Sequence, residues 1–372
     1  MQLRAATRCW LGGAAATIAV IVVGGFLVAW SGVYNIAASQ GHWRVVEWFL
    51  TFGMNNSVEL RARLVPQPPP LDNPDLIILG AGHFHRACAA CHGAPGMAPD
   101  LSARQAVPPP PELTPAPKEW NDRQLFWIVK HGIKYTGMPA WVAQERDDEV
   151  WAIVAFIKRL PQLTAASYRE LALGPVEPEP QTGREIAESG LSPFAIEACA
   201  RCHGDERRSP ASKLVPVLHG QPAEFLAAGI HDFANSRRKS GIMQPVATEL
   251  NEESIAKLAQ YYSRLNMPSP AAASSIAASG RALATEGDPA AKIPACIACH
   301  GAAAAKIFPR LAGQNAAYMA NRLRLWKSGL TSPSPTDAIM APIARLLSEE
   351  QIDAVSAWFS AARLENLGAD RQ

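Results

Sequence analysis

One five-residue pattern occurs three times in this sequence: CAACH at residues 88–92, CARCH at residues 199–203 and CIACH at residues 296–300. On a helix, positions i, i+3 and i+4 lie on one face, so the two cysteines of each copy stand together with the histidine beside them. Only Cys9 lies outside these copies, and it is interpreted as a free thiol. The chain therefore carries three sites of one kind, each built on one helical turn.

Cys-x-x-Cys-His is the attachment pattern of haem c, in which two thiols add to the porphyrin and the neighbouring imidazole binds the iron. A structural zinc site needs four protein ligands, and no spare cysteines complete three such sites. A thioredoxin-like dithiol is expected in a βαβ context and does not use the adjacent histidine. The sequence therefore predicts three covalent haems c. The predicted attachment residues are Cys88, Cys91, His92, Cys199, Cys202, His203, Cys296, Cys299 and His300.

A methionine follows each motif at a similar spacing. It lies 46 residues after the motif histidine in the first unit and 40 residues after it in the second and third units. Each of these methionines is followed by a proline within two residues and then by a helical pattern, which argues against the alternative of a gap-filling core residue. Methionine sulfur is a common second axial ligand of haem iron. The predicted iron ligands are His92 with Met138, His203 with Met243, and His300 with Met340.

The other ring nitrogen of each ligand histidine needs a hydrogen-bond acceptor. Pro216 and Pro309 each stand four residues before a shared Gly-Gln pair, and we expect their carbonyls to fill this role. The histidines that could compete as ligands are interpreted as surface or core residues: His83, His85, His131, His219 and His231.

The second and third units repeat one another. Cys199 and Cys296 are separated by 97 residues, as are Met243 and Met340, whereas the Gly-Gln pairs that begin at Gly220 and Gly313 differ by 93. One loop is therefore longer in the second unit, and the next loop is longer by the same amount in the third. Such compensation within a fixed frame indicates a duplicated domain.

Each unit ends with a segment of helical periodicity, and no run of alternating β-branched residues indicates a strand. The predicted terminal helices cover residues 147–160, 251–265 and 348–364, and Ser348 with Gln351 forms a capping box for the last. Proline-rich or small-residue stretches at residues 66–74, 174–183 and 266–280 are predicted linkers.

Residues 11–30 contain no charge and are long enough to cross a bilayer as one helix. Arg4 and Arg8 precede this run, so the positive-inside rule predicts that the N-terminus is cytoplasmic and the rest of the chain is exported. A signal peptide cleaved near residues 36–39 is the alternative. Residues 41–63 predict a helix that lies at the membrane interface or packs on the first domain. The net charge of +2 gives no case for nucleic-acid binding.

Each unit resembles a small monohaem cytochrome c of the His/Met type. The second and third units together resemble di-haem cytochromes of the c-four type, especially through residues 308–329 and 339–360. The first unit, with CAACHGAPG and LFWIVKHGIKYTGMPAW, is similar to membrane-anchored bacterial cytochrome c domains. The resemblance implies an all-α fold with three cytochrome c-like haem domains in tandem after an N-terminal transmembrane helix. The expected parts are an anchor at 1–40, an interfacial helix and linker at 41–75, and haem domains at 76–173, 183–266 and 280–364.

This resemblance implies an electron relay on the periplasmic side of a bacterial inner membrane, with no catalytic residue of its own. The implied partners are redox proteins: a dehydrogenase subunit, a quinol-oxidising complex or a terminal oxidase. One alternative makes the chain the cytochrome subunit of a membrane-bound dehydrogenase or oxidase complex. A haem peroxidase is a further alternative, but it needs an open iron site, and the regular methionine spacing argues against one.

Overall fold

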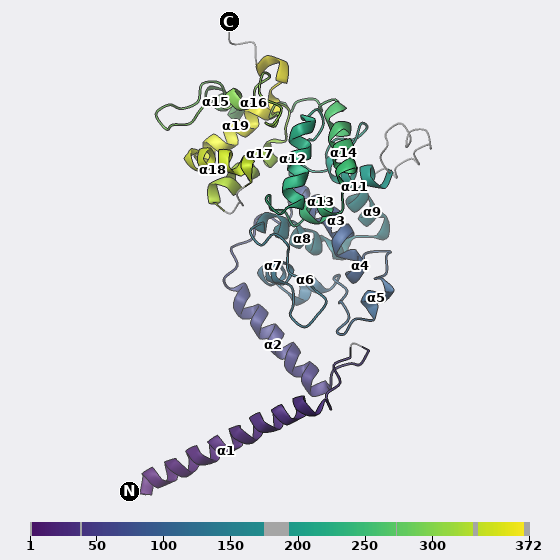
Figure 1. Ribbon diagram of the computed structural model, residues 1–372, viewed down its shortest axis with the longest axis vertical. Coiled ribbons are helices and arrows are strands. Elements are labelled where there is room, and N and C mark those ends of the chain that lie inside the picture. The colour runs from purple at the N-terminus through teal and green to yellow at the C-terminus, as the bar shows by residue number, and fades with distance from the viewer. Residues whose placement is uncertain (1, 38, 175–192, 273, 330–333, 368–372) are drawn as a thin grey trace.

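The computed structural model describes residues 2–37, 39–174, 193–272, 274–329 and 334–367. Within these ranges the chain forms α-helices and short 3-10 helices, and no β-strand (Figure 1). The all-α prediction is therefore confirmed. Most of the predicted linker at 174–183 and the predicted start of the second domain at residue 183 lie outside the described residues.

Two helices project from the body of the molecule and carry the N-terminus at their far end (Figure 1). The first, α1 (Gln2–Ser31), contains the apolar span Trp10–Ser31, which has 22 residues, a mean hydropathy of 2.3 and no buried part. By length and composition this span is able to cross a membrane. The side chain of Cys9, interpreted above as a free thiol, is not among the described side chains.

The second projecting helix, α2 (Arg44–Ala62), has two different halves. Its C-terminal end packs on α7 (Asp122–His131) and buries Val58 and Ala62. Its N-terminal half leaves Trp48 and Phe52 exposed, with their rings stacked at a centroid distance of 5.7 Å. Packing on the first unit is thus observed for one end, and a place at the membrane interface stays a prediction for the other.

The first unit is built on the crossing of α3 (Pro74–Ala87) with α8 (Asp147–Arg159). Gly80 lets the two backbones approach closely, because a Cβ at that position would lie 2.0 Å from the carbonyl oxygen of Ala152. Asn73 caps the start of α3 by accepting a hydrogen bond from the backbone N–H of Asp75. The unit also contains α4 (Ala89–His92), α5 (Leu101–Arg104), α6 (Ala116–Glu119), η1 (Leu160–Gln162) and α9 (Ala165–Leu173).

The third unit repeats this crossing with α15 (Ser275–Thr285) and α19 (Glu349–Ala361). A Cβ at Gly280 would lie 2.1 Å from the carbonyl oxygen of Ala354. Because α15 begins at Ser275, the linker predicted over residues 266–280 is wrong at its C-terminal end. The unit also contains α16 (Ile297–His300), α17 (Ala316–Ser328), α18 (Pro335–Leu346) and η2 (Leu364–Leu367).

The second unit lies between the other two along the chain and packs Ile196 against Leu258 in its core. Its elements are α11 (Pro193–His203), α12 (Ala223–Ala234), α13 (Met243–Thr248) and α14 (Glu252–Arg264). The terminal helices α8, α14 and α19 confirm the three periodic segments predicted from the sequence, and the capping box of Ser348 and Gln351 is present.

Candidate haem sites

Each Cys-x-x-Cys-His motif forms one turn of helix. In the first and third units the first cysteine caps a short helix, α4 or α16. The backbone N–H of His92 donates to the carbonyl of Cys88 at 2.9 Å, and that of His300 donates to Cys296 at 3.0 Å. In the second unit the motif is the last turn of α11. This backbone places the two thiols and the imidazole of each motif on one face, as expected.

Each motif histidine is oriented by one proline carbonyl. The Nδ1–O distances are 2.8 Å for His92 and Pro111, 3.1 Å for His203 and Pro216, and 2.9 Å for His300 and Pro309. A carbonyl oxygen only accepts, so Nδ1 carries the hydrogen and Nε2 keeps its lone pair for a metal. The roles expected for Pro216 and Pro309 are confirmed. Pro111 was not expected, although the proline run at residues 108–111 was a visible signal.

Burial favours the neutral forms of the motif histidines of the second and third units. It lowers the pKa of His203 to about 4 and also lowers the pKa of His300. A neutral imidazole is the form that binds a metal. Burial raises the pKa of the Cys88 thiol to about 12 and that of Cys199 to about 11. A redox dithiol requires the opposite shift, so these cysteines lack the electrostatics of the thioredoxin alternative.

The second and third motifs open into one cavity of about 1110 Å³. Each end of the cavity offers two cysteines, a neutral histidine and a methionine, which is the donor set of a His/Met haem c. The residues present therefore fit two haems. The donors that line it are Cys199, Cys202, His203, Met243, Cys296, Cys299, His300 and Met340.

The predicted ligands of the first unit, His92 and Met138, lie outside this shared cavity. Met138 belongs to the loop between α7 and α8, where its N–H donates to Thr136 Oγ1 at 3.1 Å. The loop folds back on the end of α7, and the N–H of Trp141 donates to the carbonyl of Lys130 at 2.9 Å. The pairing of Met138 with His92 stays a prediction.

The other histidines make contacts that suit structural roles. His83 is buried, its ring lies edge-on to Trp141 at a centroid distance of 4.9 Å, and burial followed by the Arg86 charge lowers its pKa to about 4. His131 is exposed. The remaining nitrogen contacts are His85 Nδ1 with Tyr168 Oη at 2.9 Å, His219 Nε2 with Asp205 O at 2.8 Å and His231 Nε2 with Glu252 Oε2 at 3.4 Å.

The shared Gly-Gln pairs join the second unit to the third. Gln221 Nε2 donates to the carbonyl of Arg310 at 2.8 Å, and its Oε1 accepts the Arg310 N–H at 2.9 Å. Gln314 makes the same two bonds with Val217, at 3.0 Å and 2.7 Å. The exchange follows the sequence repeat, so the two units meet about a local pseudo-twofold axis. Val217 and Arg310 directly follow the prolines that orient the motif histidines, so each unit supports the histidine segment of the other.

The first unit packs against the second motif. A Cβ on Gly82 of α3 would lie 3.6 Å from Cys202 Sγ. Asp75 at the start of α3 accepts the N–H of Lys213 at 2.8 Å, and Arg86 near its end pairs with Glu249 at 2.7 Å. The helix that leads into the first motif therefore lies directly on the second.

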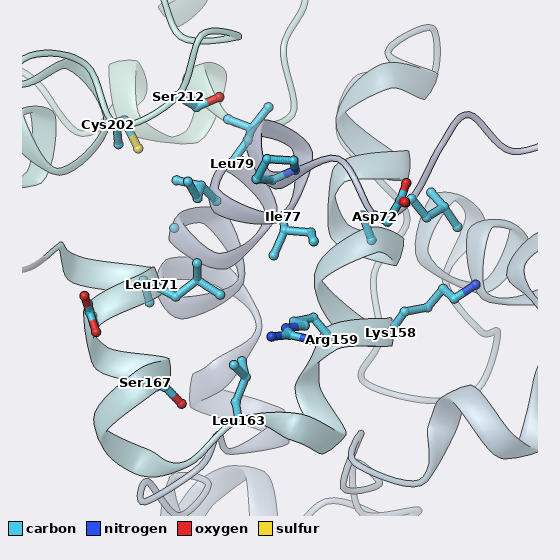
Figure 2. A pocket seen from close by; sticks show the side chains of 18 of the residues that line it. Asp72, Ile77, Leu79, Lys158, Arg159, Leu163, Ser167, Leu171, Cys202 and Ser212 are labelled. Atoms are coloured by element: carbon cyan, nitrogen blue, oxygen red, sulfur yellow. The ribbon is translucent and has the colours of Figure 1, made fainter.

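A second cavity of about 1000 Å³ lies beside this contact. Figure 2 shows Leu79 and Leu171 on its apolar wall, Lys158 and Arg159 on the other side, and Cys202 facing it from the second unit. The second motif thus borders the crevice between the first two units as well as the cavity shared with the third.

Comparisons with known proteins agree with this architecture. The family model described as cytochrome c oxidase, cbb3-type, subunit III matches residues 77–157, and the model described as cytochrome c matches residues 277–362. A thiosulfate dehydrogenase electron acceptor from Thiomonas intermedia is 35% identical over 184 residues, which cover 48% of this chain and 84% of that protein. Cytochrome c4 from Pseudomonas aeruginosa is 33% identical over 176 residues, 46% of this chain and 86% of that protein.

A solved cytochrome c4 structure from Acidithiobacillus ferrooxidans is 30% identical, covers 44% of this chain and 97% of that chain, and aligns with a TM-score of 0.41. Together with the motif geometry, the sequence relatives settle the class of protein: it is an electron-carrying cytochrome that binds haem c. The chain belongs to the c-type cytochromes, in the family that includes cytochrome c4.

The hydrogen bonds of the two buried glutamines, Gln221 and Gln314, should stabilise the interface between the second and third units. Replacing Gln314 by alanine leaves the N–H and carbonyl of Val217 without partners, and we expect the free energy of unfolding to fall by about 2–4 kcal/mol. Gln221→Ala should cost a similar amount because its bonds are equivalent. Chemical denaturation of the holoprotein, followed by haem absorbance, measures both. Gln260→Ala on the exposed face of α14 is the control. A large effect from only one glutamine would contradict the pseudo-symmetric interface.

Proposed function

We propose that this chain is a relay of three covalent haems c, each with His/Met ligation, in domains at about 76–173, 183–266 and 280–364. The observation that carries the proposal is the repeated support of the motif histidine: in each of the three motifs, Nδ1 is bound to a proline carbonyl. The sites of the second and third units share one cavity. The site of the first unit is connected to them through α3, which packs on the second motif.

Haem c, when bound, supplies a reversible one-electron change at iron. The chain contributes the positions of three such groups. The backbone of α3 meets Cys202 at Gly82, so the first and second motifs are joined by one rigid helix. The second and third motifs face the same cavity. Methionine ligands favour ferrous iron and raise the potential relative to a second histidine. Electrons would enter at one end of this series and leave at the other.

We further propose that α1 anchors the chain in a bacterial inner membrane by a single pass, with the haem domains in the periplasm. The uncharged span and the preceding arginines support this orientation. A cleaved signal peptide remains the alternative for the same segment.

The comparisons support two kinds of redox partner. Relatives that are named electron acceptors of thiosulfate dehydrogenase point to a periplasmic dehydrogenase as the electron donor. The match of the first unit to a cbb3-type oxidase subunit points to a terminal oxidase next to the membrane. We propose that the c4-like pair faces the dehydrogenase and that the first unit faces the membrane complex. A permanent cytochrome subunit of either complex is the second candidate.

Haem stoichiometry tests the relay. We expect three haems per chain that remain attached after denaturation, because each motif supplies two thiols. Cys299→Ala should weaken or remove the third haem alone, measured as haem per protein and by mass spectrometry. A wild-type ratio near two would refute one attachment site.

The axial ligands of the haem irons distinguish an electron carrier from a haem peroxidase. If Met138, Met243 and Met340 bind iron, the oxidised protein should be low-spin and should not bind carbon monoxide after reduction. Changing each of these methionines to alanine should open one haem and lower its potential, because a ligand that favours reduced iron is lost. Spin state and redox titration measure this. Met319 is a buried methionine on the cavity shared by the second and third motifs. Met319→Leu is therefore the matched control and should leave all three haems unchanged. A high-spin haem in the untreated protein would favour the peroxidase alternative.

The anchor makes a separate prediction. Full-length protein should require detergent for extraction, because the apolar span of α1 is not buried in the protein. A form that starts at Gly41 behind a cleavable signal keeps the contact of α2 with α7, and it should carry the same haems without an integral anchor. Membrane fractionation followed by N-terminal sequencing decides. A native N-terminus near Ser39 in the soluble fraction would establish the signal peptide instead.

A further inference from the structure

We propose that Glu149 of the first unit is a positioning residue for the haem of the second unit: it completes the loop that presents Met243. This inference rests on the proposed ligation of that haem by His203 and Met243. Glu149 lies in the first turn of α8, and the loop precedes α13 of the second unit; the two helices are neighbours in Figure 1.

A continuous chain of hydrogen bonds connects Glu149 to the methionine. Ser240 Oγ donates to Glu149 Oε1 at 2.5 Å, and the N–H of Gly241 donates to Oε2 at 2.7 Å. The same Ser240 oxygen accepts the N–H of Met243 at 3.0 Å. Both carboxylate oxygens are therefore used on the loop. Glu149 is 3% exposed, as is Ser240, so water does not compete for these bonds.

The loop is also closed by packing from the first unit. A Cβ at Gly241 would lie 2.2 Å from Nε1 of Trp141. The indole therefore lies against the bare backbone of this residue, and a side chain there would push the two units apart. Trp141 follows Met138 closely in the chain, so the loop after the first unit's methionine covers the loop before that of the second.

The carboxyl group of Glu149 lies beside a cation in the same cluster: burial raises the pKa of Glu149, and the charge of Arg146 opposes this shift. Arg146 Nη1 lies 2.9 Å from Glu149 Oε1 and also donates to the carbonyl of Lys239 at 2.9 Å. Arg146 holds Asp148 through two further bonds, and Asp148 accepts Asn321 Nδ2 from the third unit at 3.0 Å. A buried carboxylate is tolerated when it is paired and hydrogen-bonded in this way. The cluster therefore fixes the first unit against both of the others.

The sequence repeat shows what Glu149 replaces. The counterpart of Ser240 in the third unit is Asp337, at the same 97-residue offset as the two methionines. Asp337 Oδ1 accepts Arg322 Nη2 at 2.8 Å and Trp326 Nε1 at 2.6 Å, both from the same unit. The third unit therefore carries its own buried carboxylate three residues before its methionine, in the first turn of α18. The second unit has a serine there and receives its carboxylate from the first unit.

In both the second and the third unit an arginine lies over an aromatic ring near the methionine segment. In the third unit the guanidinium of Arg322 lies 4.7 Å from the ring centroid of Trp326. In the second unit Arg238 lies 4.6 Å from the ring centroid of Phe233, which is the counterpart of Trp326 at the 93-residue offset. The counterpart of Arg322 at this offset is Gly229, and a Cβ there would lie 3.7 Å from Arg238 Nη1, so the second unit brings its arginine to the ring from a different position in the chain and has a serine in place of the acid. Its methionine loop is complete only when the first unit is docked.

Glu149 could instead serve only to hold the first and second units together. In that case, weakening any other contact between these units should have the same effect, and Glu249 provides the matched control. Glu249 accepts a hydrogen bond from Arg86 across the same pair of units, at 2.7 Å. Glu249→Gln therefore weakens docking without removing an acceptor from Ser240 or Gly241.

The experiment uses the full-length holoprotein in detergent, with haem content checked for every variant. The ferric methionine–iron charge-transfer band and the potential of each haem are measured. Glu149→Ala should lose about one third of the band, for one haem of three, and should lower one potential. Ser240→Ala, which removes the hydroxyl between Glu149 and Met243, should show the same loss. Ser240→Asp placed in the Glu149→Ala background supplies the acid within the unit, as in the third unit, and should restore the band. Glu249→Gln should keep it.

The outcomes separate this inference from the proposed ligation. If Met243→Ala leaves the band intact, the ligation of the second haem is wrong and the inference falls with it. If Met243→Ala removes one third of the band while Glu149→Ala and Ser240→Ala remove nothing, only the inference is overturned. Equal losses from Glu149→Ala and Glu249→Gln, without rescue by Ser240→Asp, would show that Glu149 serves docking alone.

Discussion

The hydrogen bond from each motif histidine to a proline carbonyl is the constraint on which the sites depend. An imidazole has two nitrogens, and only a fixed acceptor for Nδ1 commits Nε2 to the metal. The three acceptors come from Pro111, Pro216 and Pro309. Because these carbonyls set the orientation of the motif histidine rings, any contact that holds the proline segments also supports the sites.

In the second and third units those segments are held across the interface. Gln221 and Gln314 are buried and each takes both backbone groups of the residue that follows the other unit's proline. A buried amide with every partner satisfied specifies one arrangement, because any sliding of the units would leave donors and acceptors unpaired. The two duplicated domains therefore contact each other at the segments that orient their motif histidines. A shift at this interface would disturb both sites together.

The sequence was sufficient where the signal is local. The three motifs, the periodicity of α8, α14 and α19, and the offset between repeats predicted the fold class and the cysteine and histidine positions. The carbonyls of Pro216 and Pro309 were predictable because the repeat brought both to the same place. The partners of Gln314 and Glu149 were not, because single amides and carboxylates have no periodicity and their partners lie far away in the chain.

Linkers were predicted between the units, and the structure shows the units in direct contact. α3 has the first motif at its C-terminal end and touches Cys202 of the second motif at Gly82, where no side chain separates the backbone from the sulfur. One helix therefore sets the separation of two sites. Arg146 binds the second unit and Asp148 binds the third through partly buried, charge-assisted bonds, which cost more to break than exposed ones. The spacing between the three motifs is thus set by packing between the units rather than by the lengths of their linkers.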